Sequence, residues 1–341
     1  QPLNMNRGFE GADPELMIRE IRRKDPKWLD MLFGDAIDAV AKATRHFIEA
    51  ADGHRFIVGD WVSIEAVVSA CLAGEEWKIE AFRNGEPLYE LTADMIFGFS
   101  PGTVTKKTHP TERQVGKVGE LAFTYQGAVG AWRQFDDSDR YTDDEVQAFK
   151  KGWRKKNAMI VKLWAGLEKA AIAAVQDPDQ EPHYYRAIGF EMQDEWLSMI
   201  LPNGKRIWYW RPEVSLRMPA WHKPRENEDC ATGECDHEPV PQLSYWAQKT
   251  GQWGKVYTYG GKLTENATQA AAREILAACM LRLDEAGYKL ILDVYDEIVA
   301  EMPYGEGSLE EFKSIMLESP GEWAADWPIS VDLWQGERYK K

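Results

Sequence analysis

The sequence has few cysteines, no long apolar run and a shortage of positive charge. Its 341 residues include four cysteines, which is too few for a disulfide scaffold. No apolar run is long enough to span a bilayer, and the first residues show no signal-peptide pattern. These absences argue against a secreted disulfide-rich protein and a membrane protein. They favour a protein of the reducing cytoplasm with no membrane partner.

The formal net charge of −15 is unusual for a protein that binds nucleic acid, because phosphate contacts require Lys and Arg. The charge is unevenly distributed, however. Residues 101–163 contain 12 Lys and Arg against 8 Asp and Glu, whereas residues 264–341 contain 7 against 16. A basic segment and an acidic segment suit a DNA path beside an acidic catalytic floor. Ordinary surface variation is the alternative explanation.

A predicted hairpin carries two adjacent acids. Apolar residues lead into Tyr295-Asp296-Glu297 and a second apolar run leaves it, a pattern typical of two strands joined by a tight turn. The flanks have the composition of a core, so packing does not explain the acids, although hairpin turns are often acidic for solubility alone.

A second acid follows another apolar strand. Residues 55–59 lead to Asp60, and a helix is predicted to begin a few residues later with Glu65 in its first turns. Acids at neighbouring strand ends, here Asp60 and Asp296, are typical ligands for the Mg²⁺ pair used in phosphoryl and nucleotidyl transfer.

Three motifs resemble those of the family A (DNA polymerase I-like) DNA polymerases, in the order found in that family. Asp60-x-x-Ser63-Ile64-Glu65-Ala66 resembles motif A, and Val294-Tyr295-Asp296-Glu297 resembles motif C. Between them, Arg113-x-x-x-Lys117-x-x-x-Leu121-x-x-x-Tyr125 resembles motif B, with its four residues on one face of a helix. The similarity extends over nearly the whole chain and is closest in style to bacteriophage members.

The resemblance implies template-directed DNA synthesis from dNTPs on primer-template DNA, with two Mg²⁺ ions for which Mn²⁺ can substitute. Asp60 and Asp296 would hold the metal ions, with Glu297 beside them and Lys117 as a further catalytic group. Glu65 would exclude ribonucleotides. The remaining nucleotide-binding residues would be Arg113, Leu121, Tyr125 and Tyr89, and the DNA-binding residues Gln269, Tyr295 and Asn266.

The fold implied is α+β: a right-hand palm, with an antiparallel sheet and helices, plus mostly helical fingers. Residues 1–75 would be the first part of the palm, 76–200 the fingers, and 201–341 the second part of the palm. The thumb and exonuclease domains of the family are not expected in this chain. We therefore expect a fragment, a processed product or half of a split enzyme, whose partner would be a separate N-terminal fragment carrying thumb and exonuclease. A phage-encoded enzyme would act in the cytoplasm of a bacterial host.

Three positions depart from the family pattern: Val67 stands where Arg is frequent, Tyr295 where His is usual, and Leu121 where Phe or Tyr is common. None of them is a predicted metal ligand. Two alternatives stay open. One is a single-subunit RNA polymerase, against which Glu65 argues, and the other is a non-catalytic DNA-binding remnant of a polymerase fold.

Two further patterns lie outside the motifs. Residues 222–237 contain His222, Cys230, Cys235 and His237, which are candidate zinc ligands in a spacing that matches no standard finger. An ordinary loop is the alternative. Thr142 and Glu145 form a capping-box pattern that predicts the start of a helix with apolar residues continuing to Ala171.

Overall fold

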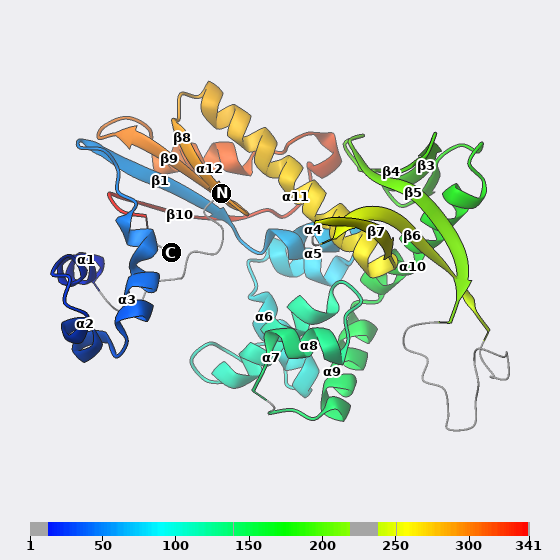
Figure 1. Ribbon diagram of the computed structural model, residues 1–341, viewed down its shortest axis with the longest axis horizontal. Coiled ribbons are helices and arrows are strands. Elements are labelled where there is room, and N and C mark those ends of the chain that lie inside the picture. Colours follow the sequence, from blue (N-terminus) through cyan, green and yellow to red (C-terminus); the bar gives the residue numbers. More distant parts are fainter. Residues whose placement is uncertain (1–12, 139, 219–237, 250, 340–341) are drawn as a thin grey trace. The chain divides into compact units, whose positions relative to one another are not determined.

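The computed structural model describes residues 13–138, 140–218, 238–249 and 251–339. The chain divides into two compact units, which are described separately. Unit 1 comprises Gln1–Ile64, Arg273–Glu322 and Ile329–Lys341, and unit 2 comprises Glu65–Ala272 and Trp323–Pro328. Each unit combines helices with an antiparallel sheet (Figure 1), so the predicted α+β class is confirmed. In the part of the chain that is described, no helix has the length and apolar character needed to cross a membrane.

Unit 1 is built on a four-stranded antiparallel sheet in the order β10-β1-β9-β8. The strands are β1 (His54–Trp61), β8 (Leu290–Val294), β9 (Glu297–Pro303) and β10 (Val331–Gly336). The helices are α1 (Pro14–Arg22), α2 (Pro26–Phe33), α3 (Ala36–Ala43), the short 3-10 helix η1 (Thr44–Phe47) and α12 (Leu309–Leu317). Helix α11 (Gly260–Glu285) begins in unit 2 and continues into unit 1, and the 3-10 helix η2 (Glu322–Ala324) also joins them.

The two faces of this sheet are different. One face packs against α12, and Gly59 makes that close approach possible, because a Cβ atom there would lie 2.1 Å from Sδ of Met316. Phe56, Val58 and Val299 form a core on the other face. Since side chains alternate along a strand, Asp60 lies on the same face as Val58. On this face, Asp60 therefore follows directly after the last apolar core residue of β1, Val58.

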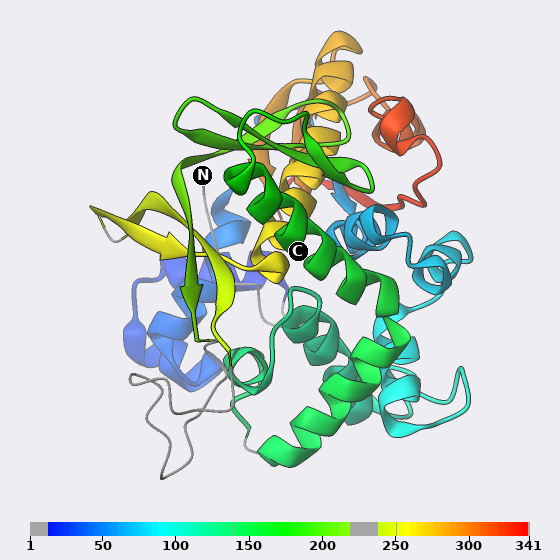
Figure 2. The same cartoon turned by 90° about the vertical axis from the view of Figure 1, so that its right-hand side faces the viewer.

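Unit 2 contains a group of helices and a six-stranded antiparallel sheet in the order β2-β3-β4-β5-β6-β7. The helices are α4 (Ile64–Ala73, starting at the boundary), α5 (Glu76–Arg83), α6 (Leu88–Phe97), α7 (Pro110–Phe123), α8 (Val129–Phe135), α9 (Asp143–Lys156) and α10 (Ala158–Gln176). The strands are β2 (His183–Tyr185), β3 (Ile188–Gln193), β4 (Trp196–Ile200), β5 (Arg206–Arg217), β6 (Val240–Lys249) and β7 (Gln252–Tyr257). Figure 2 shows α10 crossing one face of this sheet, in agreement with its contacts to β2, β3, β4, β5 and β6.

The capping box at Thr142 is confirmed, since the Thr142 side chain accepts from the Glu145 backbone and the Glu145 carboxylate accepts in return. The prediction of one helix through Ala171 was wrong. The structure breaks it at Asn157, whose φ and ψ of −100° and 49° are not helical and whose side-chain amide donates to the carbonyl of Trp153. Apolar periodicity continues across the break, so the pattern alone does not reveal it.

A buried ion pair joins four helices of unit 2. Nζ of Lys78 on α5 lies 2.6 Å from Glu120 on α7, and both side chains are almost completely buried. Glu120 also accepts hydrogen bonds from Thr92 of α6 at 2.7 Å and from the indole of Trp153 of α9 at 2.9 Å. A buried charge is tolerated when it is paired and its remaining lone pairs are satisfied. This network thus fixes α7 against its neighbours.

Replacing Lys78 by Met should lower the free energy of unfolding of unit 2 by about 3–5 kcal/mol, because Glu120 would keep a buried charge without its partner. Urea denaturation followed by tryptophan fluorescence measures this. The matched control is Arg83→Met, which removes the exposed pair with Glu80 and should leave the free energy of unfolding nearly unchanged. Equal losses in the two variants would contradict the role given to the buried pair.

Candidate active site

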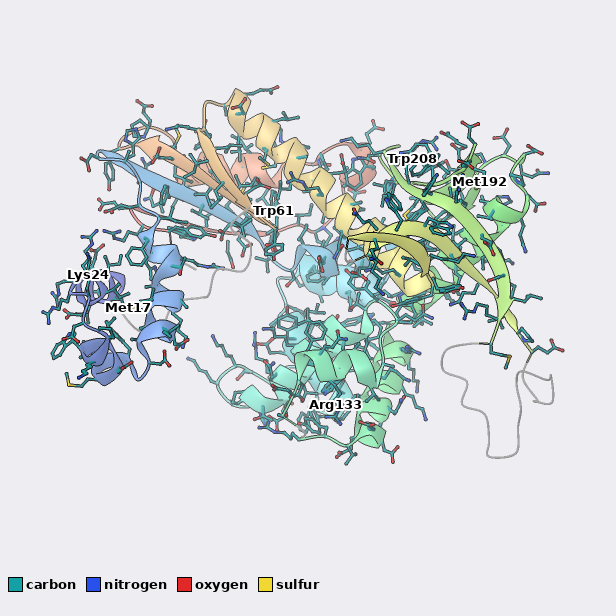
Figure 3. The ribbon with its side chains drawn as sticks, in the orientation of Figure 1. Met17, Lys24, Trp61, Arg133, Met192 and Trp208 are labelled. Atoms are coloured by element: carbon teal, nitrogen blue, oxygen red, sulfur yellow. The ribbon has the colours of Figure 1, made fainter. Side chains whose placement is uncertain are left out.

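The acids of motifs A and C are brought together by the sheet of unit 1. Asp60, near the end of β1, is paired across the strands with Glu297 at the start of β9 and with Asp332 on β10. The backbone N–H of the next residue, Trp61 (labelled in Figure 3), donates to the carbonyl of Asp296 at 3.2 Å. Asp60 and Asp296 are both half-buried. Two carboxylates 236 positions apart in the sequence thus lie on neighbouring strand ends.

The turn that carries Asp296 has the predicted form. Val294 and Glu297 pair directly, which leaves Tyr295 and Asp296 as a two-residue loop. Tyr295 adopts a left-handed backbone with φ of 56°, as tight hairpin turns require, and its side chain is 61% exposed. Glu297 is therefore the first residue of a strand and is buried, whereas Tyr295 projects to solvent.

Glu297 has a partner that the motifs do not indicate. The hydroxyl of Tyr339, close to the C-terminal end of the described residues, donates to Oε1 of Glu297. Tyr339 is almost fully buried, and the guanidinium of Arg45 lies 5.7 Å from the centre of its ring. Burial, followed by the neighbouring Glu297, raises the pKa of the Tyr339 phenol, so the hydroxyl keeps its proton and remains a donor. This contact holds the Glu297 carboxylate in one orientation.

The predicted motif B helix is α7, which carries three of the four residues of the predicted stripe, whereas the prediction that Tyr125 lies on the same helix was wrong. Arg113, Lys117 and Leu121 follow one another at intervals of four residues along it, and Tyr125 lies in the turn just beyond its end. Leu121 is 40% exposed and Lys117 is half-buried. Lys117 makes no ion pair with any residue that the structure describes. Its ammonium group is therefore available to an anionic ligand.

Arg113 is held in place by α6. Its Nε donates to Glu90 at 2.6 Å, and its guanidinium lies 5.6 Å from the centre of the Tyr89 ring. The close approach of the helices depends on Gly116, where a Cβ atom would lie 2.0 Å from the carbonyl oxygen of Tyr89. Two residues predicted to bind the triphosphate, Arg113 and Tyr89, are therefore in contact. Glu90 was not predicted, and no sequence signal identifies it.

Tyr125 is positioned by the start of α11. The backbone N–H of Gly261 donates to the side-chain carbonyl of Gln126 at 2.8 Å. A Cβ atom at Gly261 would lie 2.4 Å from the carbonyl oxygen of Tyr125, and one at Gly260 would lie 2.0 Å from that of Trp164. Gly261 thus lets α11 pack directly on the turn that carries Tyr125, and Gly260 lets it pack on α10.

Glu65, Tyr125 and Gln269 form one cluster in unit 2, together with Glu265 and Thr268. Although Glu65 is exposed as a residue, its carboxyl group is partly shielded from water, and this desolvation raises its pKa. The nearby Gln269 side chain opposes the shift in this pKa, the negative charge of Glu265 adds to it, and the nearby Tyr125 phenol opposes it. Burial, and then the charge of Glu65, raise the pKa of Tyr125 well above 10.0. The phenol is therefore neutral and available as a donor.

The remaining predicted residues differ in how they lie. Asn266 donates to the hydroxyl of Tyr209 on β5 at 2.9 Å, a contact that anchors α11 to the sheet. Gln269 is exposed one turn further along α11. The candidate zinc ligands His222, Cys230, Cys235 and His237 lie outside the described residues. The other two cysteines, Cys71 and Cys279, are free thiols, and burial raises the pKa of each to about 12.

The acids of unit 1 have the chemistry of a magnesium site. Oxygen ligands suit Mg²⁺, which proteins commonly hold with one or two carboxylates while substrate phosphates complete the coordination. No group of three His, Cys, Asp or Glu side chains within the described ranges is arranged to hold a metal ion. Asp60 and Asp296 are two carboxylates of this kind.

Comparisons with known proteins identify relatives in sequence and in structure. No model of a known protein family matches the chain. A curated relative, a DNA polymerase of Bacillus phage SP02, is 35% identical over 316 residues, which is 92% of this chain. The chain spans 45% of the length of that relative. Among solved structures, the POL domain of Pol1 from M. smegmatis, in complex with DNA primer-template and dNTP, has a TM-score of 0.55 at 16% identity. That match covers 88% of this chain and 42% of the solved one.

The fold is accordingly that of a polymerase POL domain, with helices and antiparallel sheets arranged as in the mycobacterial structure. The sequence identity to the phage relative, 35%, is higher than the 16% identity to the solved structure. The three motifs, in the order found in the family A, DNA polymerase I-like, polymerases, agree with the similarity of the chain to a phage DNA polymerase.

Because the pKa of Glu65 is raised, the free energy of unfolding should depend on pH through this residue. The folded-state pKa lies above the ordinary 4.5, so ionising Glu65 costs the folded state more than the unfolded state. That penalty is absent below pH 4.5 and complete above the folded-state pKa. Glu65→Gln should therefore be more stable than the parent at pH 7, and the difference should disappear as the pH falls through 4.5.

Chemical denaturation between pH 4 and pH 8 measures this difference. The control is Glu76→Gln, which removes an exposed acid from the first turn of α5 and should destabilise slightly at pH 7. A Glu65→Gln variant that is less stable than the parent at pH 7 would show that Glu65 is not desolvated in this way.

Proposed function

We propose that this chain carries the nucleotidyl-transfer site of a template-directed DNA polymerase. The observation that carries the proposal is the meeting of Asp60 and Asp296, joined through the hydrogen bond from Trp61 to the Asp296 carbonyl. Core packing does not require acids at this position, because the apolar face of the sheet ends at Val58. The name of the phage relative, a DNA polymerase, supports the same activity.

The substrates are proposed on chemical grounds and from the comparison. The mycobacterial POL domain was solved with DNA primer-template and dNTP. We infer the same classes of ligand here, because acids, cations and an aromatic group are present at the motif positions. In the reaction, the primer 3′-oxygen bonds to the α-phosphorus of a dNTP. The bond from that phosphorus to the bridging oxygen breaks, and pyrophosphate departs.

Asp60 and Asp296 are the residues that would hold Mg²⁺, or Mn²⁺ in its place. Bound there, the two ions would lower the pKa of the attacking hydroxyl and offset charge on the departing pyrophosphate. Glu297, next to Asp296 in the sequence, would help to position the metal-binding acids, since the hydrogen bond from Tyr339 holds its own carboxylate in place. Because Glu297 is buried, its carboxylate would not compete with substrate oxygens for coordination positions on the metal ions.

Cations on α7 would receive the triphosphate. Lys117, without an ion-pair partner among the described residues, would offset charge that builds on the phosphates and protonate the leaving group. Arg113 is already oriented by Glu90 and Tyr89, so its guanidinium would be in position before the nucleotide arrives. Leu121, exposed on the same stripe, would contact the nucleotide further along the helix.

The cluster of Glu65, Tyr125 and Gln269 would contact the sugar and the nascent base pair. Tyr125 would pack beside the templating pair, and Glu65 would occupy the space that a 2′-hydroxyl needs. Gln269 and Asn266 on α11 and Tyr295 in the hairpin turn would contact DNA, with the Tyr295 phenol able to donate to a primer phosphate. Sequence would be read by base pairing.

The proposal extends to domains and partners. Residues 1–75 and 201–341 would form the palm, and residues 76–200 the fingers. The phage relative is more than twice as long as the matched region, which supports cooperation with polymerase segments that carry a thumb and exonuclease, on a separate fragment or otherwise. The phage origin of that relative supports action in a bacterial cytoplasm. A structural zinc at residues 222–237 stays a separate hypothesis.

Asp60→Asn and Asp296→Asn should each reduce nucleotide incorporation at least about a hundredfold while leaving primer-template affinity within about threefold, because each removes a proposed metal ligand. Single-turnover extension of a labelled primer measures the first quantity, and fluorescence anisotropy the second.

The control for these variants is Asp293→Asn. Asp293 lies in the same hairpin as Asp296 and is paired with Ile298. Its side chain is therefore on the face of the sheet opposite to Asp60, where it forms an ion pair with Arg273. Its replacement should leave extension nearly unchanged. More than a few per cent of parental activity in Asp60→Asn or Asp296→Asn would contradict the metal assignment.

Glu65→Ala tests sugar selection and separates the DNA polymerase from an RNA polymerase. A carboxylate above the sugar should reject a ribonucleotide by about 3–5 kcal/mol, roughly a thousandfold. We expect the ratio of kcat/KM for matched dNTP and rNTP to fall toward one in Glu65→Ala, mainly through a gain with rNTP. If the ratio does not change, Glu65 is only a helix-start acid, worth under about 1 kcal/mol to the helix.

A further inference from the structure

The six-stranded sheet of unit 2 has one covered face and one open face. Phe190, Met199 and Leu243 point to the covered side, where α10 packs, and all three are buried. The opposite face carries a group of large aromatic side chains. Because directly paired residues of antiparallel strands point to the same side, the register identifies its members.

A row of aromatic residues crosses the open face. Trp196, Trp210 and Trp246 are paired in succession across β4, β5 and β6, and the row continues to Lys255 on β7. The same face carries further aromatics two residues away along β5 and β7. We call the set the aromatic sheet face: Trp196, Trp208, Trp210, Trp246, Trp253 and Tyr257.

Five of the six rings are exposed, and a chain of ring contacts joins Trp196, Trp208, Trp210 and Trp253. Trp253 is 60% exposed and Trp208 is 44% exposed, and Trp208 (labelled in Figure 3) extends from β5. The centre of the Trp196 ring lies 6.5 Å from that of Trp208 and 6.4 Å from that of Trp210, which in turn lies 5.2 Å from that of Trp253. Large contiguous apolar patches are rare on a free protein surface and usually mark a binding site.

Guanidinium groups alternate with the rings. Arg217 lies 4.1 Å from the centre of the Tyr257 ring, and Arg211 lies 4.8 Å from that of Trp210. Arg206 lies 5.9 Å from Trp208 and also pairs with Glu191. Residues 183–217 and 240–257 contain seven Lys and Arg against four Asp and Glu, an excess of positive charge in a chain of net charge −15.

We propose that the aromatic sheet face binds single-stranded DNA. Flat aromatic surfaces stack on bases of any identity, and arginines beside them pair with phosphates, so the two kinds of group match the two parts of a nucleotide. An open antiparallel sheet with a few aromatic residues can stack two or three bases. A protein partner would also use Trp and Arg, but the local positive excess favours a polyanion.

The choice of DNA rather than RNA rests on the proposed function, and the site goes beyond it. An unpaired strand held here would be a second DNA contact, separate from the residues assigned to nucleotidyl transfer. The face is made only of unit 2 side chains, none of which belongs to the three motifs. Its loss should therefore affect binding of unpaired DNA without changing the chemistry.

The test measures affinity for a labelled oligothymidine of about 20 nucleotides by fluorescence anisotropy, using the full chain. The double variant Trp208→Ala/Trp253→Ala should bind at least about tenfold more weakly than the parent. Trp208→Phe/Trp253→Phe, which keeps flat rings, should recover most of that affinity. Phe135→Ala removes an exposed aromatic residue of α8 and serves as the control, with no expected change.

The outcomes separate this inference from the polymerase activity. Single-nucleotide incorporation on a saturating primer-template with a short overhang should be equal in the parent and in the Trp variants. Parental affinity for oligothymidine in the Ala variant would overturn the inference, as would equal loss in the Phe variant or tighter binding of oligouridine. If the Ala variant fails to fold, Arg217→Glu replaces it, with at least about tenfold weaker binding expected and unchanged affinity overturning the inference. A parent that binds oligothymidine but does not extend primers would leave this site standing and refute the proposed function.

Discussion

The buried pair of Lys78 and Glu120 is the interaction on which the arrangement of α7 depends. Burying two charges is favourable only when they meet at good geometry and their other hydrogen-bonding positions are filled. Thr92 and Trp153 fill those positions on Glu120, so three neighbouring helices are fixed to one carboxylate. The residues that would receive a triphosphate lie on this same helix. A nucleotide site made of long, flexible cations gains its precision from such a rigid support.

Close backbone packing also positions the other residues that are proposed to bind the nucleotide. Gly116 lets α6 approach α7, which places Tyr89 beside Arg113, and Gly261 lets α11 approach the turn that contains Tyr125. In unit 1, Gly59 has the same effect beneath Asp60, because α12 packs flat against β1. At each place a Cβ atom would separate the elements. The backbone therefore determines where the functional side chains lie, and the side chains provide the chemistry.

Much of this was predictable from the sequence because the motifs combine local pattern with family order. The hairpin around Asp296, the strand that leads to Asp60, the helix of Arg113 and Lys117 and the capping box at Thr142 all have local signals, and the structure has each of them. The contacts of Glu297 with Tyr339 and of Arg113 with Glu90 have none, since each joins segments through tertiary packing. The break at Asn157 was missed because apolar periodicity continues through it. The aromatic sheet face was visible only as a tryptophan-rich stretch, since strand register decides which rings share a side.

The proposed function is template-directed nucleotidyl transfer, in which Asp296 would hold a metal ion and Lys117 would contact the triphosphate. Equilibrium binding of a dNTP to the chain on a primer-template whose primer lacks a 3′-hydroxyl tests it most directly, because no chemistry intervenes. We expect tight binding only of the nucleotide complementary to the template, and weaker binding in both Lys117→Ala and Asp296→Asn. Binding that ignores the templating base, or that responds to only one of the two replacements, would contradict it.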